Sequence, residues 1–169
     1  QDRSLKELTK DERIYFRELE ESDANRLFEI YSNEEAMKFR ETEPMKTIDD
    51  AYKMLTRDKE MRQTSYEFRF AIIEKKSDIL IGTIMYQPVG DKAIIGYSID
   101  EKFWNNGYGS SVVKIMLNEL ISKKFNLLEA WVKKGNFASC KVLEKNLFQS
   151  ISQTIYPNLN LYQYRIFNS

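Results

Sequence analysis

Histidine is absent from this chain of 169 residues, and cysteine occurs once, at Cys140. The lack of histidine removes the commonest catalytic base, the Ser-His and Cys-His nucleophile pairs, and most zinc sites. A single cysteine excludes an intrachain disulfide and favours a reducing, cytoplasmic setting. We therefore expect no metal site, and a general base that is a carboxylate, a tyrosine, a lysine or water.

The formal net charge is zero, and the chain has no long apolar run. Lysine plus arginine and aspartate plus glutamate each number 26, so the chain lacks the basic excess that non-specific nucleic-acid binding requires. No apolar run approaches the roughly 20 residues of a membrane span, and no secretory signal is visible. The length suits a single domain, residues 1–169, with one core; monomer and homodimer both stay open.

Hydrophobic periodicity predicts alternating strands and helices. Strands are expected at residues 13–19, 67–73, 79–86, 93–99, 127–132, 148–155 and 160–167. Helices are expected after a cap at Ser22 or Asp23, from a Thr47–Asp50 capping box to about residue 60, and at residues 110–124 and 138–146. With a turn at residues 88–92 and a crossover after residue 99, this order predicts an α/β (α+β) fold. Its mixed, mostly antiparallel sheet of about seven strands has helices on both faces.

A loop with two glycines, between a strand and a helix, carries the main chemical signal. Gly107 and Gly109 let the backbone approach a ligand closely. The helix start that follows offers unpaired N–H groups and a partial positive charge, which suit a pyrophosphate. A plain tight turn is the competing interpretation. A P-loop is excluded because no lysine lies between Lys102 and Lys114, and a Rossmann fingerprint because residues 110–124 contain no third glycine.

Several motifs, in the right order, resemble the GNAT N-acetyltransferases, and within them the group typified by the ribosomal-protein alanine acetyltransferases RimJ and RimL. Residues 104–109, WNNGYG, match the acyl-CoA loop R/Q-x-x-G-x-G/A, with tryptophan first as in that group. Residues 136–145, NFASCKVLEK, match N-x-A-S-x-x-V-L-E-K. Residues 23–34 match D-A-x-x-L-F and S-(D/N)-x-E, and residues 96–100 supply its Gly-Tyr and Asp. The resemblance covers residues 13–167.

The resemblance implies an acetyl-CoA-dependent acyltransferase that moves acetyl directly to a primary amine, without an acetyl-enzyme. It also implies that the sheet splays between residues 93–99 and 127–132, where pantetheine lies. The acceptor stays open: a peptide N-terminus, a polyamine, an antibiotic amine or another small metabolite. The implied cofactor contacts are Ser98, Ile99, Asp100, Trp104, Asn105, Asn106, Gly107, Tyr108, Gly109, Ser110, Ser111 and Asn136. The last of these is equally suited to cap a helix.

Two residues are candidates for catalysis. Glu129 lies on the strand that flanks the splay, where related N-terminal acetyltransferases carry a proposed base glutamate. Much of the RimJ/RimL group has another glutamate where this chain has Ile94, so either Glu129 or ordered water must accept the amine proton. Ser139 is the candidate donor to the leaving sulfur, because Leu143 stands where some GNAT enzymes have a tyrosine. A solvated strand carboxylate and a helix cap are the structural alternatives for Glu129 and Ser139.

The acceptor side is expected between the first two helices. Their link holds Glu34, Glu35, Glu41 and Glu43, which either attract a cationic amine or form a solvated charged face. Residues 146–148, Asn-Leu-Phe, depart from the family's Leu-Gly-Phe near the acceptor mouth, so acceptor identity does not carry over. Because acids are missing at positions 94 and 143, a second hypothesis stays open: a CoA-binding module that senses or regulates without catalysis.

Overall fold

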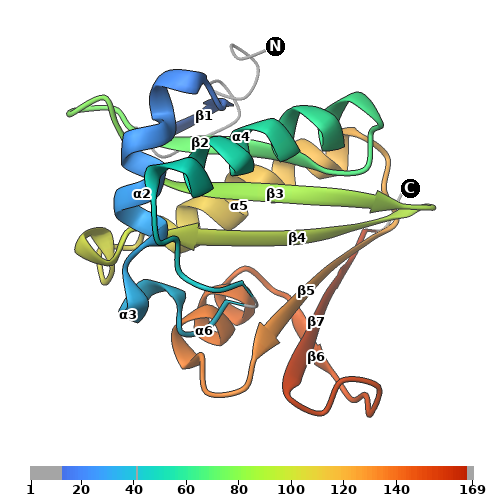
Figure 1. The fold of residues 1–169 in the computed structure, drawn as a ribbon. Helices are drawn as coiled ribbons and strands as arrows, with labels where there is room; N and C mark the ends of the chain where they lie inside the picture. Colours follow the sequence, from blue (N-terminus) through green and yellow to red (C-terminus); the bar gives the residue numbers. More distant parts are fainter. Residues whose placement is uncertain (1–12, 41, 167–169) are drawn as a thin grey trace.

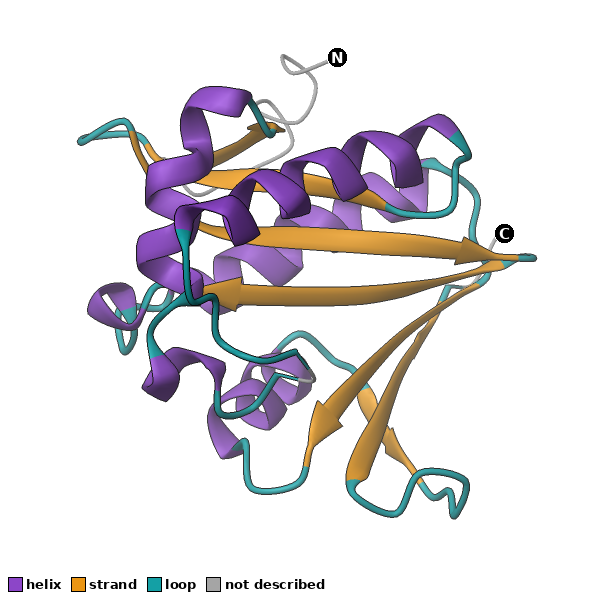
Figure 2. Ribbon diagram, in the orientation of Figure 1, coloured by secondary structure: helices purple, strands orange, loops and turns teal. Residues whose placement is uncertain are grey.

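The computed structural model describes residues 13–40 and 42–166, arranged around one seven-stranded sheet (Figures 1 and 2). Its strands lie in the order β1-β2-β3-β4-β5-β7-β6. They are β1 (Ile14–Glu18), β2 (Phe68–Glu74), β3 (Ile79–Val89), β4 (Lys92–Ile99), β5 (Leu127–Lys133), β6 (Gln149–Ile151) and β7 (Leu159–Arg165). The helices are η1 (Glu21–Asp23), α2 (Ala24–Tyr31), α3 (Glu34–Met37), α4 (Ile48–Gln63), η2 (Glu101–Phe103), α5 (Tyr108–Ser122) and α6 (Phe137–Lys145). The expected mixed, mostly antiparallel α/β fold is confirmed.

The sheet opens between β4 and β5, the parallel pair that α5 connects. Their pairing runs from Lys92 opposite Leu127 to Ile95 opposite Ala130 and then stops. β4 continues to Ile99, and β5 continues while paired with β7 alone. The two strands therefore diverge in the direction in which both run, with α3 and α6 at the wide end (Figure 1). The expected splay of the sheet is confirmed.

Apolar side chains form a core on each face of the sheet. Ala71 and Ile73 of β2 pack with Leu27 of α2 on one face. Ile72 points the other way and packs with Val112 of α5. This alternation is the two-residue period of a strand, and it places α4 and α5 on opposite sides of the sheet (Figure 2).

Local capping signals were predicted with mixed success. The Thr47–Asp50 capping box is confirmed: both reciprocal bonds form, and the Thr47 amide donates to Asp50 Oδ2 over 3.3 Å. Asp23 is the N-cap residue of α2, one of the two positions predicted, but its side chain makes no capping bond to that helix. A short 3-10 turn comes first, its cap is Glu20, and Asp23 accepts the Glu20 amide over 2.8 Å from the third position of that turn. The Asp23 carboxylate therefore completes the capping box of the 3-10 turn instead of binding an amide of the helix that follows.

Three predicted boundaries also change. β3 runs through Pro88, and the turn lies at Gly90 and Asp91; Pro88 lies beyond the last residue that β2 pairs, so its missing N–H costs no sheet bond. α5 begins at Tyr108, which puts Gly109 inside the helix. β6 is short, and residues 152–158 form a loop. No helix in the described ranges is long and apolar enough to cross a membrane.

Candidate active site

A cavity of about 410 Å³ lies where β4 and β5 separate. Its walls come from four parts of the chain: the link between α2 and α4, the end of β4, the loop that leads into α5, and α6. The lining residues include Ala36, Phe39, Arg40, Tyr97, Ser98, Ile99, Phe103, Trp104, Asn105, Gly107, Tyr108, Gly109, Ser110, Asn136, Ala138, Ser139, Lys141, Val142 and Lys145. Most of the cofactor-binding residues expected from the sequence therefore meet at one cavity. Asp100, Asn106, Ser111 and Glu129 do not line it.

The glycine loop gives the start of α5 its shape. Gly107 caps the helix with φ of +79°, a left-handed conformation that glycine adopts without strain, and Asn105 has φ of +63°. Gly109 is less constrained. A Cβ there would lie 3.4 Å from Val142 of α6 and 3.6 Å from the ring of Tyr97, which are ordinary contact distances, so the packing of these elements does not require glycine. Gly107, Tyr108, Gly109 and Ser110 line the cavity, so the helix start, whose first amides have no intrahelical partner, lies where an anion site requires it.

The loop is fastened from the edge of the sheet by Arg13. Its Nη1 donates to the Asn106 carbonyl over 2.7 Å, and its Nη2 donates to Ser111 Oγ over 3.2 Å. The guanidinium also lies 4.5 Å from the ring centre of Tyr108. The Tyr108 hydroxyl in turn donates to Glu74 of β2. Asn106 and Ser111 thus hold the loop in place, a role that no local sequence pattern indicated because Arg13 is distant in the chain.

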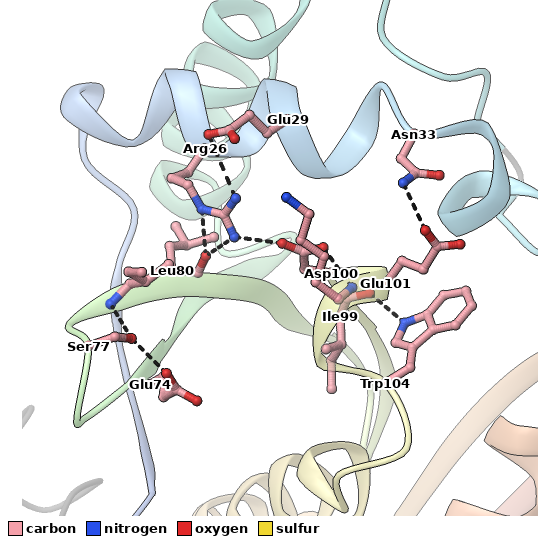
Figure 3. Close-up of polar contacts among 12 residues, drawn as sticks. Arg26, Glu29, Asn33, Glu74, Ser77, Leu80, Ile99, Asp100, Glu101 and Trp104 are labelled. Carbon is pink, nitrogen blue, oxygen red and sulfur yellow. Dashed lines mark hydrogen bonds and ion pairs between the residues drawn. The ribbon is translucent and has the colours of Figure 1, made fainter.

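A second set of contacts holds the turn after β4 (Figure 3). Arg26 of α2 donates to the Leu80 carbonyl over 2.7 Å and pairs with Asp100 over 2.8 Å. The Trp104 indole donates to the Ile99 carbonyl over 2.8 Å. Asp100, expected among the cofactor contacts, is therefore engaged by an arginine that stabilises its charge. These bonds hold the end of β4 against α2.

Ser139 faces the cavity beside Tyr97. The Tyr97 hydroxyl donates to Ser139 Oγ over 3.3 Å. Burial raises the pKa of Tyr97 to about 12, although the bond to Ser139 acts in the opposite direction. Tyr97 therefore stays neutral at any ordinary pH and keeps its proton to donate. Asn136 caps α6, because its Oδ1 accepts the Ser139 amide over 3.2 Å; its Nδ2 remains a donor at the cavity wall.

Glu129 has both carboxylate oxygens engaged. Lys92 Nζ lies 3.1 Å from Oε1, and Gln163 Nε2 donates to Oε2 over 2.8 Å. The side chain is buried, and its strand position is opposite Ile94, one pair before the strands part. Sequence position alone suggested a carboxylate at the splay; the structure adds an ion pair with Lys92, a partner that lies on another strand.

The link between α2 and α4 was expected on the acceptor side, with glutamates that either attract a cationic amine or form a solvated charged face, and the structure favours the solvated face. Glu34 and Glu35 are exposed on α3, and Glu35 pairs with Lys38 over 2.6 Å. Neither they nor Glu43 line the cavity, and Glu41 lies outside the described residues. The same link contributes Ala36, Phe39 and Arg40 instead. The charge that this link brings to the cavity wall is therefore positive.

These features define the class: an α/β enzyme whose sheet opens beside a glycine loop and a helix start, as in acyl-CoA-dependent acyltransferases. A family model described as an acetyltransferase (GNAT) domain matches residues 13–149. The uncharacterized N-acetyltransferase YoaA of Bacillus subtilis (strain 168) is 28% identical over 164 residues, which cover 93% of each chain. The chain belongs to the GNAT family of acetyl-CoA-dependent N-acetyltransferases.

Solved structures agree in fold. RimL, a ribosomal L7/L12 alpha-N-protein acetyltransferase, in complex with coenzyme A matches with a TM-score of 0.80 at 18% identity, over 94% of this chain and 97% of RimL. The spermidine N-acetyltransferase from Vibrio cholerae, in complex with CoA and spermine, matches with a TM-score of 0.76 at 14% identity, over 90% of this chain and 94% of that one. The resemblance to the RimJ/RimL group that the motifs indicated is in keeping with these neighbours.

Proposed function

We propose that acetyl passes directly from acetyl-CoA to a primary amine while both are bound in the cavity between β4, α6 and the α2–α4 link. One observation carries this: the cavity has two unlike walls at the splay. The loop and α6 form one wall, with helix-start amides and Lys141 and Lys145. The link forms the other wall, with Phe39 and Arg40. A pyrophosphate suits the first wall, which leaves the second for the acceptor.

The cofactor wall has a donor for each polar part of the cofactor. The amides of the loop and of the α5 start would hold the pyrophosphate, and Lys141 and Lys145 add positive charge beside it. Asn136 Nδ2 would donate to a pantetheine carbonyl, since its Oδ1 already caps α6. The loop's anchor to Arg13 keeps these donors in one arrangement, so little ordering accompanies binding.

The chemical step needs the sulfur to leave with a donor beside it. The amine nitrogen attacks the thioester carbonyl carbon, and the C–S bond breaks to release CoA thiolate. Ser139 Oγ donates a hydrogen bond to that thiolate, and Tyr97 orients Ser139 by donating to it. Leu143, where a tyrosine acid stands in other GNAT enzymes, is buried in the core and takes no part.

The proton of the attacking amine has two proposed acceptors, Glu129 and ordered water. Both oxygens of Glu129 already have partners, Lys92 and Gln163, and the side chain does not line the cavity. The geometry therefore favours water.

A Glu129→Gln variant distinguishes Glu129 from water as the proton acceptor. With water as the acceptor, kcat/KM should change by less than about tenfold across neutral pH; loss of a base would lower it roughly 10²–10⁴-fold. A loss of that size that shrinks as pH approaches the pKa of the amine would identify Glu129 as the base.

The test of the whole proposal is thiol release from acetyl-CoA across a panel of amines and peptides, with products identified by mass spectrometry. Acetyl-CoA should also raise the melting temperature. A thermal shift without thiol release from any acceptor would favour the alternative, a CoA-binding module that does not catalyse transfer. The neighbours' acceptors do not decide the panel, because RimL acts on a ribosomal protein and the Vibrio enzyme on spermidine.

A further inference from the structure

Arg40 has a fixed place on the acceptor wall. Its amide donates to the Met37 carbonyl over 2.9 Å, and its carbonyl accepts Lys133 Nζ of β5 over 2.9 Å. Its guanidinium carbon lies 5.2 Å from the ring centre of Tyr31. The Tyr31 hydroxyl lies 2.7 Å from Ser98 Oγ, and Ser98 lines the same cavity. The backbone and the ring therefore hold this cation beside the space that the acceptor would fill.

Arg40 forms no ion pair with a carboxylate among residues 13–40 and 42–166, although Tyr31 and Glu67 favour its charged form electrostatically. Its Nε is buried and has no hydrogen-bond partner there. Burial lowers the pKa of Arg40 from its ordinary value of 12.5, and the nearby Arg69 acts in the same direction. A partly buried guanidinium without an anion is costly, because lost hydration is not replaced.

Glu67, the carboxylate that acts electrostatically on Arg40, is engaged elsewhere. Glu67 is buried, lies 3.5 Å from Arg69 and accepts Gln87 Nε2 over 3.1 Å. Arg69 also donates to Thr83 Oγ1, which lies 2.6 Å from the Tyr31 hydroxyl. This side of the sheet thus holds Arg40, Arg62 and Arg69 with the buried carboxylates Glu67 and Asp58, and neither carboxylate forms an ion pair with Arg40. An acid bound at Arg40 would supply that partner.

We infer that the acceptor carries an acidic group, a carboxylate or a phosphate, in addition to its primary amine, and that Arg40 binds this group. The inference rests on the proposed transfer, since it names the class of acceptor for that same cavity. The planar guanidinium presents paired N–H donors that match either acid, and a charge-assisted pair would satisfy donors that now lack partners. A polyamine, which has no acidic group, would leave Arg40 unpaired and add like charge beside it.

The experiment compares matched acceptors. The panel contains free amino acids and their primary amides, phosphoethanolamine and ethanolamine, and spermidine. For the best acid, kcat/KM should exceed that of its uncharged partner by roughly 10- to 100-fold, the scale of a hydrogen bond to a charged group. Arg40→Gln should abolish this preference, and Arg40→Lys should keep part of it. Arg57→Gln, an exposed arginine on α4, is the matched control and should keep all of it.

A binding measurement separates this inference from the proposed transfer. CoA, which has no acetyl group to give, is bound first, and the same compounds are then added at millimolar concentration in a thermal-shift assay. Acids that raise the melting temperature of wild type but not of Arg40→Gln support acid recognition even if no acceptor is acetylated.

The inference is overturned if amides or spermidine react as well as acids, if Arg40→Gln keeps the preference for acids, or if no acid raises the melting temperature of the CoA complex. Retained stabilisation by acetyl-CoA shows that Arg40→Gln is folded. If that stabilisation is lost, Arg40→Lys replaces it in the comparison, and an undiminished preference for acids in Arg40→Lys overturns the inference.

Discussion

Placing the same residue at two glycines tests whether the loop holds the cofactor. Gly107 and Gly90 both have left-handed backbone, with φ of +79° and +62°. A non-glycine residue in that conformation costs about 1–2 kcal/mol. A Cβ at Gly90 meets nothing within 4 Å, and one at Gly107 meets Arg13 Nη2 at 3.6 Å, an ordinary contact. Gly107→Glu and Gly90→Glu should each lower the melting temperature by roughly 2–8 °C, given about 2–4 °C per kcal/mol at this size.

Only one of the two variants should lose the response to acetyl-CoA. At about 100 times its Kd, a ligand stabilises the native state by about 2.7 kcal/mol, which raises the melting temperature roughly 5–11 °C. Gly90→Glu should keep this increase. Gly107→Glu should lose it, because its carboxylate would lie at the start of α5 beside Arg13 and so occupy the anion site itself. Equal increases in both variants, measured by differential scanning fluorimetry, would refute the assignment of the loop to the pyrophosphate.

Three further outcomes are expected. Ser139→Ala should lower kcat roughly 10²-fold, because one donor to the developing charge is lost, and acetyl-CoA affinity should not change. A normal kcat would show that Ser139 serves only at the start of α6. Because the pKa of Tyr97 rises from 10.0 to about 12 on folding, the native state keeps a proton that the unfolded chain loses. Stability should therefore fall as pH rises between those values. In Tyr97→Phe, the part of this fall that Tyr97 causes should be absent from the urea midpoints. Gly82→Ala should be severely destabilised in urea unfolding, because its Cβ would lie 2.1 Å from the Ser98 carbonyl oxygen; a near-normal midpoint would contradict that contact.

What the sequence predicts well is local in the chain. The Thr47–Asp50 capping box and the alternation of Ala71, Ile72 and Ile73 depend on spacing alone, and both appear in the structure. The glycine loop is similar, since its residues are contiguous. Gly109 shows the limit: it was expected to admit the cofactor, whereas its place inside α5, against Val142 and Tyr97, could be seen only in the fold.

Partners distant in the chain could not be predicted. The sequence indicated Asp100 and Glu129 as carboxylates of the site. In the structure each forms an ion pair with a cation from another element, Asp100 with Arg26 and Glu129 with Lys92. Pairing of this kind depends on tertiary packing, which no spacing encodes. Arg40 was missed for a related reason, because the glutamates around it dominated the charge of its segment. Only the fold shows that Glu34 and Glu35 are exposed and that Arg40 lines the cavity.

The anchor at Arg13 connects the cofactor loop to the strand where the sheet ends. β1 pairs with β2 alone, so it is an edge strand, and such elements open locally at lower free energy than central ones. When β1 opens, Arg13 releases the Asn106 carbonyl and Ser111, and the loop loses its support. By linkage, a bound cofactor must then oppose that opening and slow amide hydrogen exchange along β1. Hydrogen exchange along β1 thus reports whether the cavity is occupied, although no residue of β1 lines it.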